Sequence, residues 1–259
     1  MNNLRKYGNP PFKIALIHGG PGAAGEMVPV ARELSSKLGI LEPLQTKNTI
    51  EGQLNELKSV LEKNATPPVT LIGFSWGAWL SLILASKYPE LTQKLILISS
   101  GPFEEKYAEN IQETRLNRLS KKEKSQVTSL IEYLNNPEVE NKNELFEKTG
   151  KLLSKADAYE PIEYPSEIID YRYGIFQSVW KEASELRTKG MLLEYAKNIK
   201  CPVVAIHGDY DPHPAVGVQE PLSSIISNFR FILLEKCGHK PWIEKHARDK
   251  FYKILKQEL

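Results

Sequence analysis

The sequence has little of what secreted, membrane-spanning or nucleic-acid-binding proteins usually carry. Only two of the 259 residues are cysteines, too few for a disulfide framework, and the spacing of Cys201 and Cys237 matches no zinc motif. Neither sign of charge dominates: the net charge of +2 gives no general reason to expect nucleic acid or an anionic membrane as a partner. No apolar run approaches the span of a bilayer, and residues 1–8 lack the hydrophobic region of a secretory signal. We therefore expect a cytoplasmic protein with reduced thiols and no membrane or nucleic-acid partner, while the oligomeric state stays unknown.

What the sequence does contain is a regular alternation of short apolar runs and amphipathic segments. The runs predict core strands, and the segments between them predict helices, because apolar residues recur there at spacings of three and four. The strands are expected at 12–17, 39–42, 67–72, 94–99, 201–207 and 229–234, and the helices at 24–38, 49–63, 78–88 and 241–256. Continuous apolar strands that alternate with helices are typical of a mostly parallel α/β sheet with helices on both faces.

The stretch from residue 103 to residue 199 departs from this rhythm. It is highly charged, its apolar spacing predicts helices over 111–134, 143–154 and 182–197, and it contains no convincing core strand. Its densest aromatic cluster is Tyr171–Phe176. We interpret it as a helical cap of residues 103–199, inserted into a core of residues 1–102 and 200–259. The aromatic residues either line a pocket under the cap or bind the helices of the cap together.

The most informative motif is Gly73-Phe74-Ser75-Trp76-Gly77, which lies between a predicted strand and a predicted buried helix. Strand, Gly-x-Ser-x-Gly, helix is typical of a nucleophile elbow, a sharp turn that lifts a serine hydroxyl above the end of a parallel strand. The glycines are needed because the turn brings strand and helix so close that a Cβ atom would not fit. Ser75 is therefore the candidate nucleophile.

A serine nucleophile needs a base, which in this architecture is a histidine late in the chain, beyond the end of a strand. His239 alone of the five histidines follows a late core strand in a loop. His246 is expected inside the last helix, and His18 and His207 precede the expected acid. His213 lies beside the candidate acid and is expected to line the pocket instead. His239 is the predicted base, and we expect its ring within about 2.6–3.2 Å of the Ser75 hydroxyl.

The acid that orients the base is expected after the strand at 201–207, where two aspartates occur. Asp211 is favoured because it lies further beyond the strand end and because Pro212 keeps its backbone extended. Asp209 is then expected to bond turn amides.

An oxyanion hole requires backbone N–H donors, and one should be Trp76, the residue after the nucleophile. The other should come from the loop His18-Gly19-Gly20-Pro21-Gly22. Pro21 has no N–H, so Gly20 is the predicted donor. A phosphate-binding interpretation of this loop is disfavoured, since neither Lys-Ser/Thr nor the Rossmann spacing follows.

Together, the motifs at 18–22, 73–77, 207–211 and 238–239 resemble those of an α/β-hydrolase-fold serine hydrolase with a helical cap. The paired motifs at 18–22 and 73–77 are most similar to proline iminopeptidases. The resemblance covers residues 12–100 and 200–258. It implies removal of an N-terminal proline, with acidic residues of the cap holding the free amine. The carboxylates available for that role lie in the aromatic part of the cap and are Glu160, Glu163, Glu167 and Asp170.

The sequence thus predicts a serine hydrolase that cleaves a small ester or amide, in a small molecule or short peptide, through an acyl-enzyme intermediate. Ser75 attacks, His239 moves the proton, Asp211 orients His239, and Gly20 and Trp76 hold the oxyanion. No metal or cofactor is needed. A proline iminopeptidase and a non-catalytic ligand-binding protein on the same fold are the alternatives.

Overall fold

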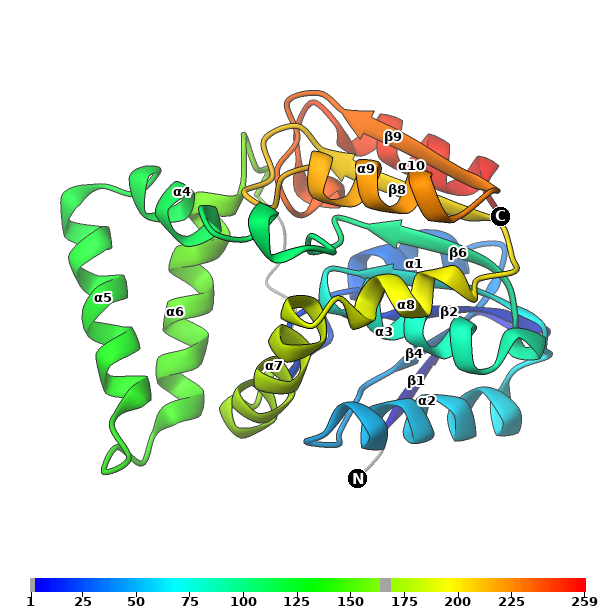
Figure 1. The fold of residues 1–259 in the computed structure, drawn as a ribbon, viewed down its shortest axis with the longest axis horizontal. Coiled ribbons are helices and arrows are strands. Elements are labelled where there is room, and N and C mark those ends of the chain that lie inside the picture. The colour runs from blue at the N-terminus through cyan, green and yellow to red at the C-terminus, as the bar shows by residue number, and fades with distance from the viewer. Residues whose placement is uncertain (1–2, 164–168) are drawn as a thin grey trace.

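Seven strands form one sheet at the centre of the structure, a computed structural model that describes residues 3–163 and 169–259 (Figure 1). In sheet order they are β1 (Leu4–Tyr7), β4 (Gly39–Pro43), β2 (Phe12–Ile17), β5 (Val69–Phe74), β6 (Thr92–Ile98), β8 (Val203–Gly208) and β9 (Phe229–Leu234). β1 pairs antiparallel with β4, and every other pairing is parallel. The central strands β5 and β8 are buried along their whole length, as expected for strands covered on both faces.

Helices cover both faces of this sheet. Apolar side chains of α2 (Ile50–Asn64), α3 (Trp76–Lys87) and α9 (Val216–Ile225) form one core cluster, and those of α1 (Val28–Ser35) and α10 (Arg248–Gln257) belong to the other. α2 begins where the Thr49 hydroxyl accepts a hydrogen bond from the Gly52 N–H. α3 is apolar all round because it is buried on every side.

Three core elements differ from the sequence prediction. β1 was not predicted, because its residues Leu-Arg-Lys-Tyr lie at the sheet edge and form no apolar run. α9 was not predicted either, and it contains Pro221, a residue that disfavours a helix interior. The last helix is divided into a 3₁₀ turn at Pro241–Ile243 and α10. His246 therefore lies in the turn before α10, and its predicted place inside the helix was wrong.

The segment predicted as a cap is helical, with two breaks that the apolar spacing did not reveal. Its helices are α4 (Ile111–Asn117), α5 (Lys121–Asn135), α6 (Lys142–Asp157), α7 (Tyr173–Thr188) and α8 (Met191–Lys197). Ser120 and Glu123 form a capping box that starts α5 and separates it from α4. Gly190, in the left-handed conformation, separates α7 from α8.

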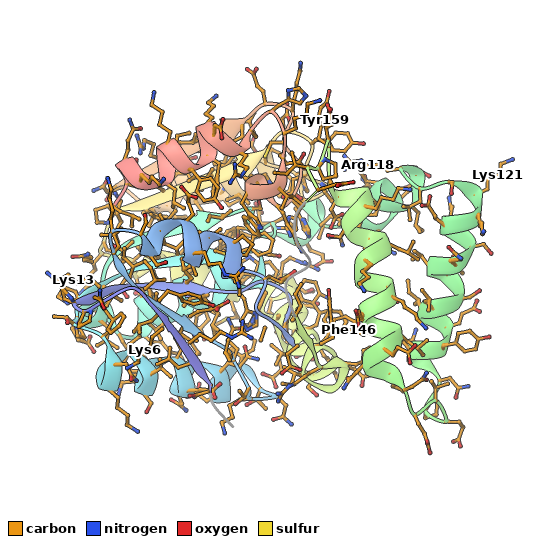
Figure 2. All side chains as sticks on the ribbon, turned by 180° about the vertical axis from the view of Figure 1, so that it is seen from behind. Lys6, Lys13, Arg118, Lys121, Phe146 and Tyr159 are labelled. Carbon is orange, nitrogen blue, oxygen red and sulfur yellow. The ribbon has the colours of Figure 1, made fainter. Side chains whose placement is uncertain are left out.

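These helices divide into two groups in space. α5 and α6 form a hairpin that stands away from the sheet, and its small cluster of buried apolar residues is Leu119, Val127 and Ala156 (Figures 1 and 2). α7 and α8 instead contribute Val179 and Leu192 to a core cluster of the sheet. The domain boundaries at 102/103 and 199/200 stay a prediction.

Aromatic rings join the hairpin to α7. The Phe146 ring of α6 lies 4.6 Å from the Phe176 ring and 5.8 Å from the Tyr173 ring, centroid to centroid, and it also contacts Tyr171 (Figure 2). Of the two roles considered for the cluster at 171–176, the described contacts correspond to binding helices together. In the described part of the chain, no helix has the length and apolarity needed to cross a membrane.

Candidate active site

Ser75 occupies the turn between β5 and α3 with φ 52° and ψ −115°, a conformation that non-glycine residues rarely adopt. Its N–H donates to the carbonyl of Ile98 on the neighbouring strand. The two glycines of the motif are required sterically: a Cβ at Gly73 would lie 2.3 Å from the Gly77 carbonyl oxygen, and one at Gly77 would lie 2.2 Å from the Ile17 carbonyl oxygen. The local geometry is therefore that of a strained elbow which presents a serine at the end of a strand.

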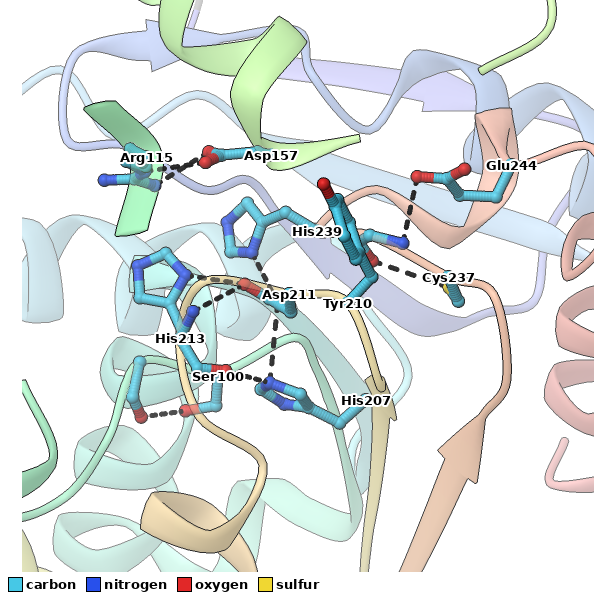
Figure 3. Close-up of polar contacts among 12 residues, drawn as sticks. Ser100, Arg115, Asp157, His207, Tyr210, Asp211, His213, Cys237, His239 and Glu244 are labelled. Carbon is cyan, nitrogen blue, oxygen red and sulfur yellow. Dashed lines mark hydrogen bonds and ion pairs between the residues drawn. The ribbon is translucent and has the colours of Figure 1, made fainter. Parts of the chain in front are cut away.

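Asp211 and His239, far apart in sequence, meet beyond the ends of β8 and β9. His239 Nδ1 lies 2.7 Å from Asp211 Oδ2, and both side chains are buried (Figure 3). The His239 ring also packs on the ring of Phe74, the residue before Ser75, with centroids 4.9 Å apart. No hydrogen bond joins the described side chains of Ser75 and His239, so the predicted contact between base and serine is not formed in this structure. Catalytic hydrogen bonds of this kind often tighten only when substrate is bound.

Two further imidazoles surround Asp211 (Figure 3). His213 Nδ1 lies 2.8 Å from Asp211 Oδ1, which also accepts the His213 backbone N–H at 2.9 Å. His207 Nε2 lies 3.5 Å from Asp211 Oδ2 and 2.8 Å from the His213 carbonyl oxygen. His213 is thus a direct partner of the acid, a contact that the sequence analysis did not predict, and its expected place in a pocket wall stays a prediction.

This environment keeps the acid ionised. Burial alone would raise the pKa of Asp211, but the His239, His213 and His207 imidazoles hold it well below its usual range. Burial lowers the pKa of His213 to about 4, against the opposing attraction of Asp211. Burial also lowers the pKa of His207. At neutral pH the ionised carboxylate therefore lies beside two imidazoles, those of His213 and His207, that burial keeps neutral.

Two other carboxylates hold the loop that carries the base in place. Asp209 Oδ1 accepts the Cys237 N–H at 3.1 Å, the turn-amide bond that the sequence predicted for it. The Glu244 carboxylate is completely buried and accepts the N–H groups of Gly238, Tyr159 and Glu160. Glu244 thus joins the histidine loop to the chain after α6 and helps to fix His239.

The two predicted oxyanion donors lie at the expected places in the fold. Trp76 is the first residue of α3, where a helix leaves its N–H without an intrahelical partner. Gly20 follows β2, in a loop where a Cβ at Gly19 would lie 2.6 Å from the Phe74 ring. Among the described residues, none accepts a hydrogen bond from the N–H of Gly20 or Trp76. Both groups are therefore unoccupied donors near the elbow, and their role stays a prediction.

Comparison with known proteins fits this geometry. The family model of the alpha/beta hydrolase fold matches residues 42–246. The chain belongs to the alpha/beta hydrolase family. The fold class expected from the motifs is thereby confirmed.

Several relatives of this alpha/beta hydrolase are proline iminopeptidases. That of Lactobacillus helveticus (strain DPC 4571) is 25% identical over 287 residues, with 95% of this chain and 89% of the relative covered. That of Saccharolobus solfataricus is 24% identical over 267 residues, with 94% and 83% covered.

Solved structures resemble the hydrolase in fold. VinJ superimposes with a TM-score of 0.69 at 14% identity, over 98% of this chain and 93% of VinJ. E-2-(acetamidomethylene)succinate hydrolase superimposes with a TM-score of 0.64 at 16% identity, over 98% and 93%.

Two ion pairs beside the candidate base of the hydrolase were missed by the sequence analysis. Arg115 of α4 forms a two-pronged pair with Asp157 of α6, at 2.6 and 2.7 Å, and the Asp157 carbonyl accepts the His239 N–H (Figure 3). Lys240 Nζ lies 3.0 Å from Glu26 Oε1, beside Gly19. Lys240 could have been noticed, since it follows His239, whereas no local pattern links Arg115 to Asp157.

Of the carboxylates considered for binding a substrate amine, the three that the structure describes are exposed or paired with other side chains. Glu160 pairs with Lys245 and His246 at the surface, Glu163 is exposed, and Asp170 pairs with Arg172. Glu167 lies outside the described residues. The described members of this set therefore give no support for an amine-binding carboxylate above Ser75.

The atoms of Asp211, His213 and His239 that could bind a metal all lie within 4.8 Å of one another. Both imidazole Nδ1 atoms face separate oxygens of Asp211 at hydrogen-bond distance. Hydrogen bonding therefore accounts for the clustering of these three side chains.

Proposed function

We propose that this alpha/beta hydrolase is a serine hydrolase that cleaves a small ester or amide through an acyl-enzyme. The observation that carries the proposal is the buried 2.7 Å contact between Asp211 Oδ2 and His239 Nδ1, next to an elbow that holds Ser75 at φ 52°. An ionised acid on Nδ1 fixes the imidazole tautomer that leaves Nε2 free to accept the serine proton.

In the proposed reaction, the Ser75 oxygen attacks the substrate carbonyl while His239 Nε2 takes the hydroxyl proton. The N–H groups of Gly20 and Trp76 stabilise the negative charge on the carbonyl oxygen. His239 then gives the proton to the leaving group, and an acyl-Ser75 ester remains. A water molecule, deprotonated by His239, hydrolyses this ester and restores the serine. Asp211 stabilises the imidazolium in both steps without itself taking the proton.

The charges around the site favour a substrate that is neutral near the scissile bond. Glu26 is paired with Lys240, and Asp157 is paired with Arg115, so each of these carboxylates already has a cation. An unpaired substrate ammonium would have to compete with these cations or remain unpaired, which is costly in a buried site.

Proline iminopeptidase activity is the second candidate, supported by the names of the relatives at 24–25% identity. It requires a carboxylate at a fixed distance from Ser75 to hold the free amine, and Glu26 is the described carboxylate beside the predicted oxyanion loop. If the enzyme is an iminopeptidase, Glu26→Gln should raise KM for prolyl-naphthylamide and leave a neutral ester almost unaffected.

The test is covalent labelling with a fluorophosphonate probe, followed by a substrate screen. We expect the probe to modify Ser75, identified by peptide mass spectrometry, and Ser75→Ala to remain unlabelled. We expect p-nitrophenyl esters of short acids to be hydrolysed faster than aminoacyl-naphthylamides. Faster hydrolysis of prolyl-naphthylamide would favour the iminopeptidase. A folded native chain that neither labels nor turns over any substrate would be a ligand-binding protein.

A further inference from the structure

The acid in the proposed reaction holds two imidazoles, although the reaction needs only one. Asp211 Oδ2 faces His239 Nδ1 at 2.7 Å, and Asp211 Oδ1 faces His213 Nδ1 at 2.8 Å. An ionised carboxylate can only accept hydrogen bonds, so each Nδ1 carries a hydrogen. The two oxygens of one carboxylate are thus divided between two histidine side chains, and the function of the second is unassigned.

The position of the second imidazole is fixed by its backbone. His213 stands between Pro212 and Pro214, and a residue that precedes proline is confined to extended conformations. Its carbonyl accepts a hydrogen bond from His207, and its own N–H donates to Asp211 Oδ1. The His213 ring lies against the His239 ring, with centroids 4.5 Å apart and planes inclined by 30°. A surface histidine would have none of these restraints.

We propose that His213 is a positioning residue of this hydrolase: its Nδ1–H holds Asp211 Oδ1, which directs Oδ2 to His239 and limits the negative charge that His239 experiences. The proposal rests on the proposed serine-hydrolase function. His213 contacts the acid rather than the substrate, so it acts through Asp211. A base that experiences less negative charge remains unprotonated to lower pH, which keeps it able to accept the serine proton.

The arrangement requires a neutral His213, because two positively charged rings in contact would repel each other. Burial holds the pKa of His213 at about 4, and Arg115 of α4 lowers it in the same direction. The other groups that face this pair of rings are His207 of β8 and the Asp157 carboxylate, which is occupied by Arg115. His207 is itself kept neutral by burial.

Two substitutions of similar size distinguish the effect of the His213 N–H donor from the effect of the volume that the side chain fills. Asn can place an N–H near the position of the His213 Nδ1, whereas Leu has the same shape as Asn without a donor. We expect His213→Leu to lower kcat about tenfold, with little change in KM, because it removes a hydrogen bond to a charged group. The acid limb of the kcat/KM profile should move to higher pH by about half a unit. His213→Asn should recover most of the lost activity and the native pH profile.

The control is His246→Leu, at a surface histidine outside the site, which should leave kcat/KM within about twofold of the native value. The proposal is overturned if His213→Leu and His213→Asn lose the same activity, since the donor would then be irrelevant. It is equally overturned if neither variant differs from the native enzyme.

Proton NMR of the native chain tests the hydrogen bonds even if His213→Leu does not fold. The shared acid predicts two low-field imidazole N–H signals at neutral pH. The signal of the second ring should disappear in His213→Asn, which has no imidazole there, while the other persists. A single such signal in the native chain would contradict the proposal. Fluorophosphonate labelling reports separately on the reaction. A chain that shows both signals but is not labelled would contradict the proposed serine-hydrolase function, while the hydrogen bonds of Asp211 to both histidines would still be supported.

Discussion

The loops beyond β8 and β9 and the α5–α6 hairpin use charged side chains in opposite ways. In the loops, Asp211 is buried and each of its oxygens has a defined imidazole partner. Along the hairpin, away from its end at Asp157, the ion pairs lie at the surface, and their partners are close in sequence or on the neighbouring helix. These pairs are Glu144–Lys148, Glu147–Lys151 and Glu123–Lys155. Buried charges fix geometry because losing a partner is costly, whereas exposed pairs contribute little.

This difference indicates which parts of the molecule fix the positions of the proposed catalytic groups. The groups that must meet at the proposed nucleophile lie on loops anchored by the sheet. The hairpin has a small apolar cluster of its own, and among the described residues it contacts the site at its end, where Asp157 meets Arg115 and His239. We therefore expect large effects from changes at the strand ends, intermediate effects at this junction and very small effects along the hairpin.

The largest effect is expected at the proposed nucleophile and base. Ser75→Ala and His239→Ala should each lower kcat by about 10⁴-fold or more, and the double variant should be little worse, because the two groups act as one unit. Steady-state turnover of the best p-nitrophenyl ester measures this. Additive losses in the double variant would mean that the two residues act independently, contrary to the proposed mechanism. Ser36→Ala, at the exposed end of α1, is the matched control.

The next effect compares the two aspartates after β8. Asp211→Asn should lower kcat by about 10³–10⁴-fold, because an amide favours the wrong imidazole tautomer. Asp209→Asn should lose far less, since the hydrogen bond that the described structure gives the Asp209 carboxylate is with the Cys237 backbone N–H. The same ester assay decides between them. If Asp209→Asn were the more damaging change, our assignment of the acid would be wrong.

The residues of the strand-end loops were accessible from sequence because their positions follow from local patterns. An apolar strand, the motif at 73–77 and the order of serine, acid and histidine predicted Ser75, Asp211 and His239. The structure brings the acid and the histidine together and places the serine on the strained elbow. Their catalytic roles remain proposals. The parallel sheet followed in the same way from continuous apolar runs.

What could not be predicted depends on contacts between distant segments. Arg115 and Asp157 meet only because α4 and α6 fold against each other, and no periodicity records that pairing. The contact between His213 and Asp211 could not be predicted either, because a histidine between two prolines is compatible with lining a pocket and with contacting the acid. β1 was not predicted because an edge strand with one exposed side needs no apolar run. Long-range side-chain partners were thus the unpredictable part of both fold and site.

At the junction between hairpin and site, breaking the buried ion pair should lower stability. Arg115→Met removes one partner of a largely buried pair and leaves Asp157 uncompensated, which should reduce the free energy of unfolding by about 3 kcal/mol. Urea unfolding followed by circular dichroism measures this. A change in the free energy of unfolding below about 1 kcal/mol would mean that this pair contributes no more than an exposed ion pair does. The junction and the hairpin surface would then not differ.

The acid network should also make stability depend on pH. The pKa of His213 is lowered by burial from 6.5 to about 4, so between these values the unfolded chain binds a proton that the folded chain excludes. The stability contributed by neutral His213 is therefore present above pH 6.5 and is lost as the pH falls toward 4. At about 1.4 kcal/mol per pH unit, the native chain should lose ~3 kcal/mol more than His213→Asn over this range. Urea unfolding at pH 7 and pH 4 gives both values, and equal losses would show that His213 titrates normally.

The smallest effect is expected on the hairpin surface. Lys151 and Glu147 lie one turn apart on α6, with 69% and 41% of their side chains exposed. Water and salt screen such a pair, so Lys151→Met should change the free energy of unfolding by less than about 0.5 kcal/mol and leave kcat/KM unchanged. Because Arg115→Met makes the same kind of replacement at the junction, the difference between the two variants isolates the effect of burial. A loss of activity in Lys151→Met would mean that the outer face of the hairpin acts on the site, and the division between precise loops and tolerant hairpin would then fail.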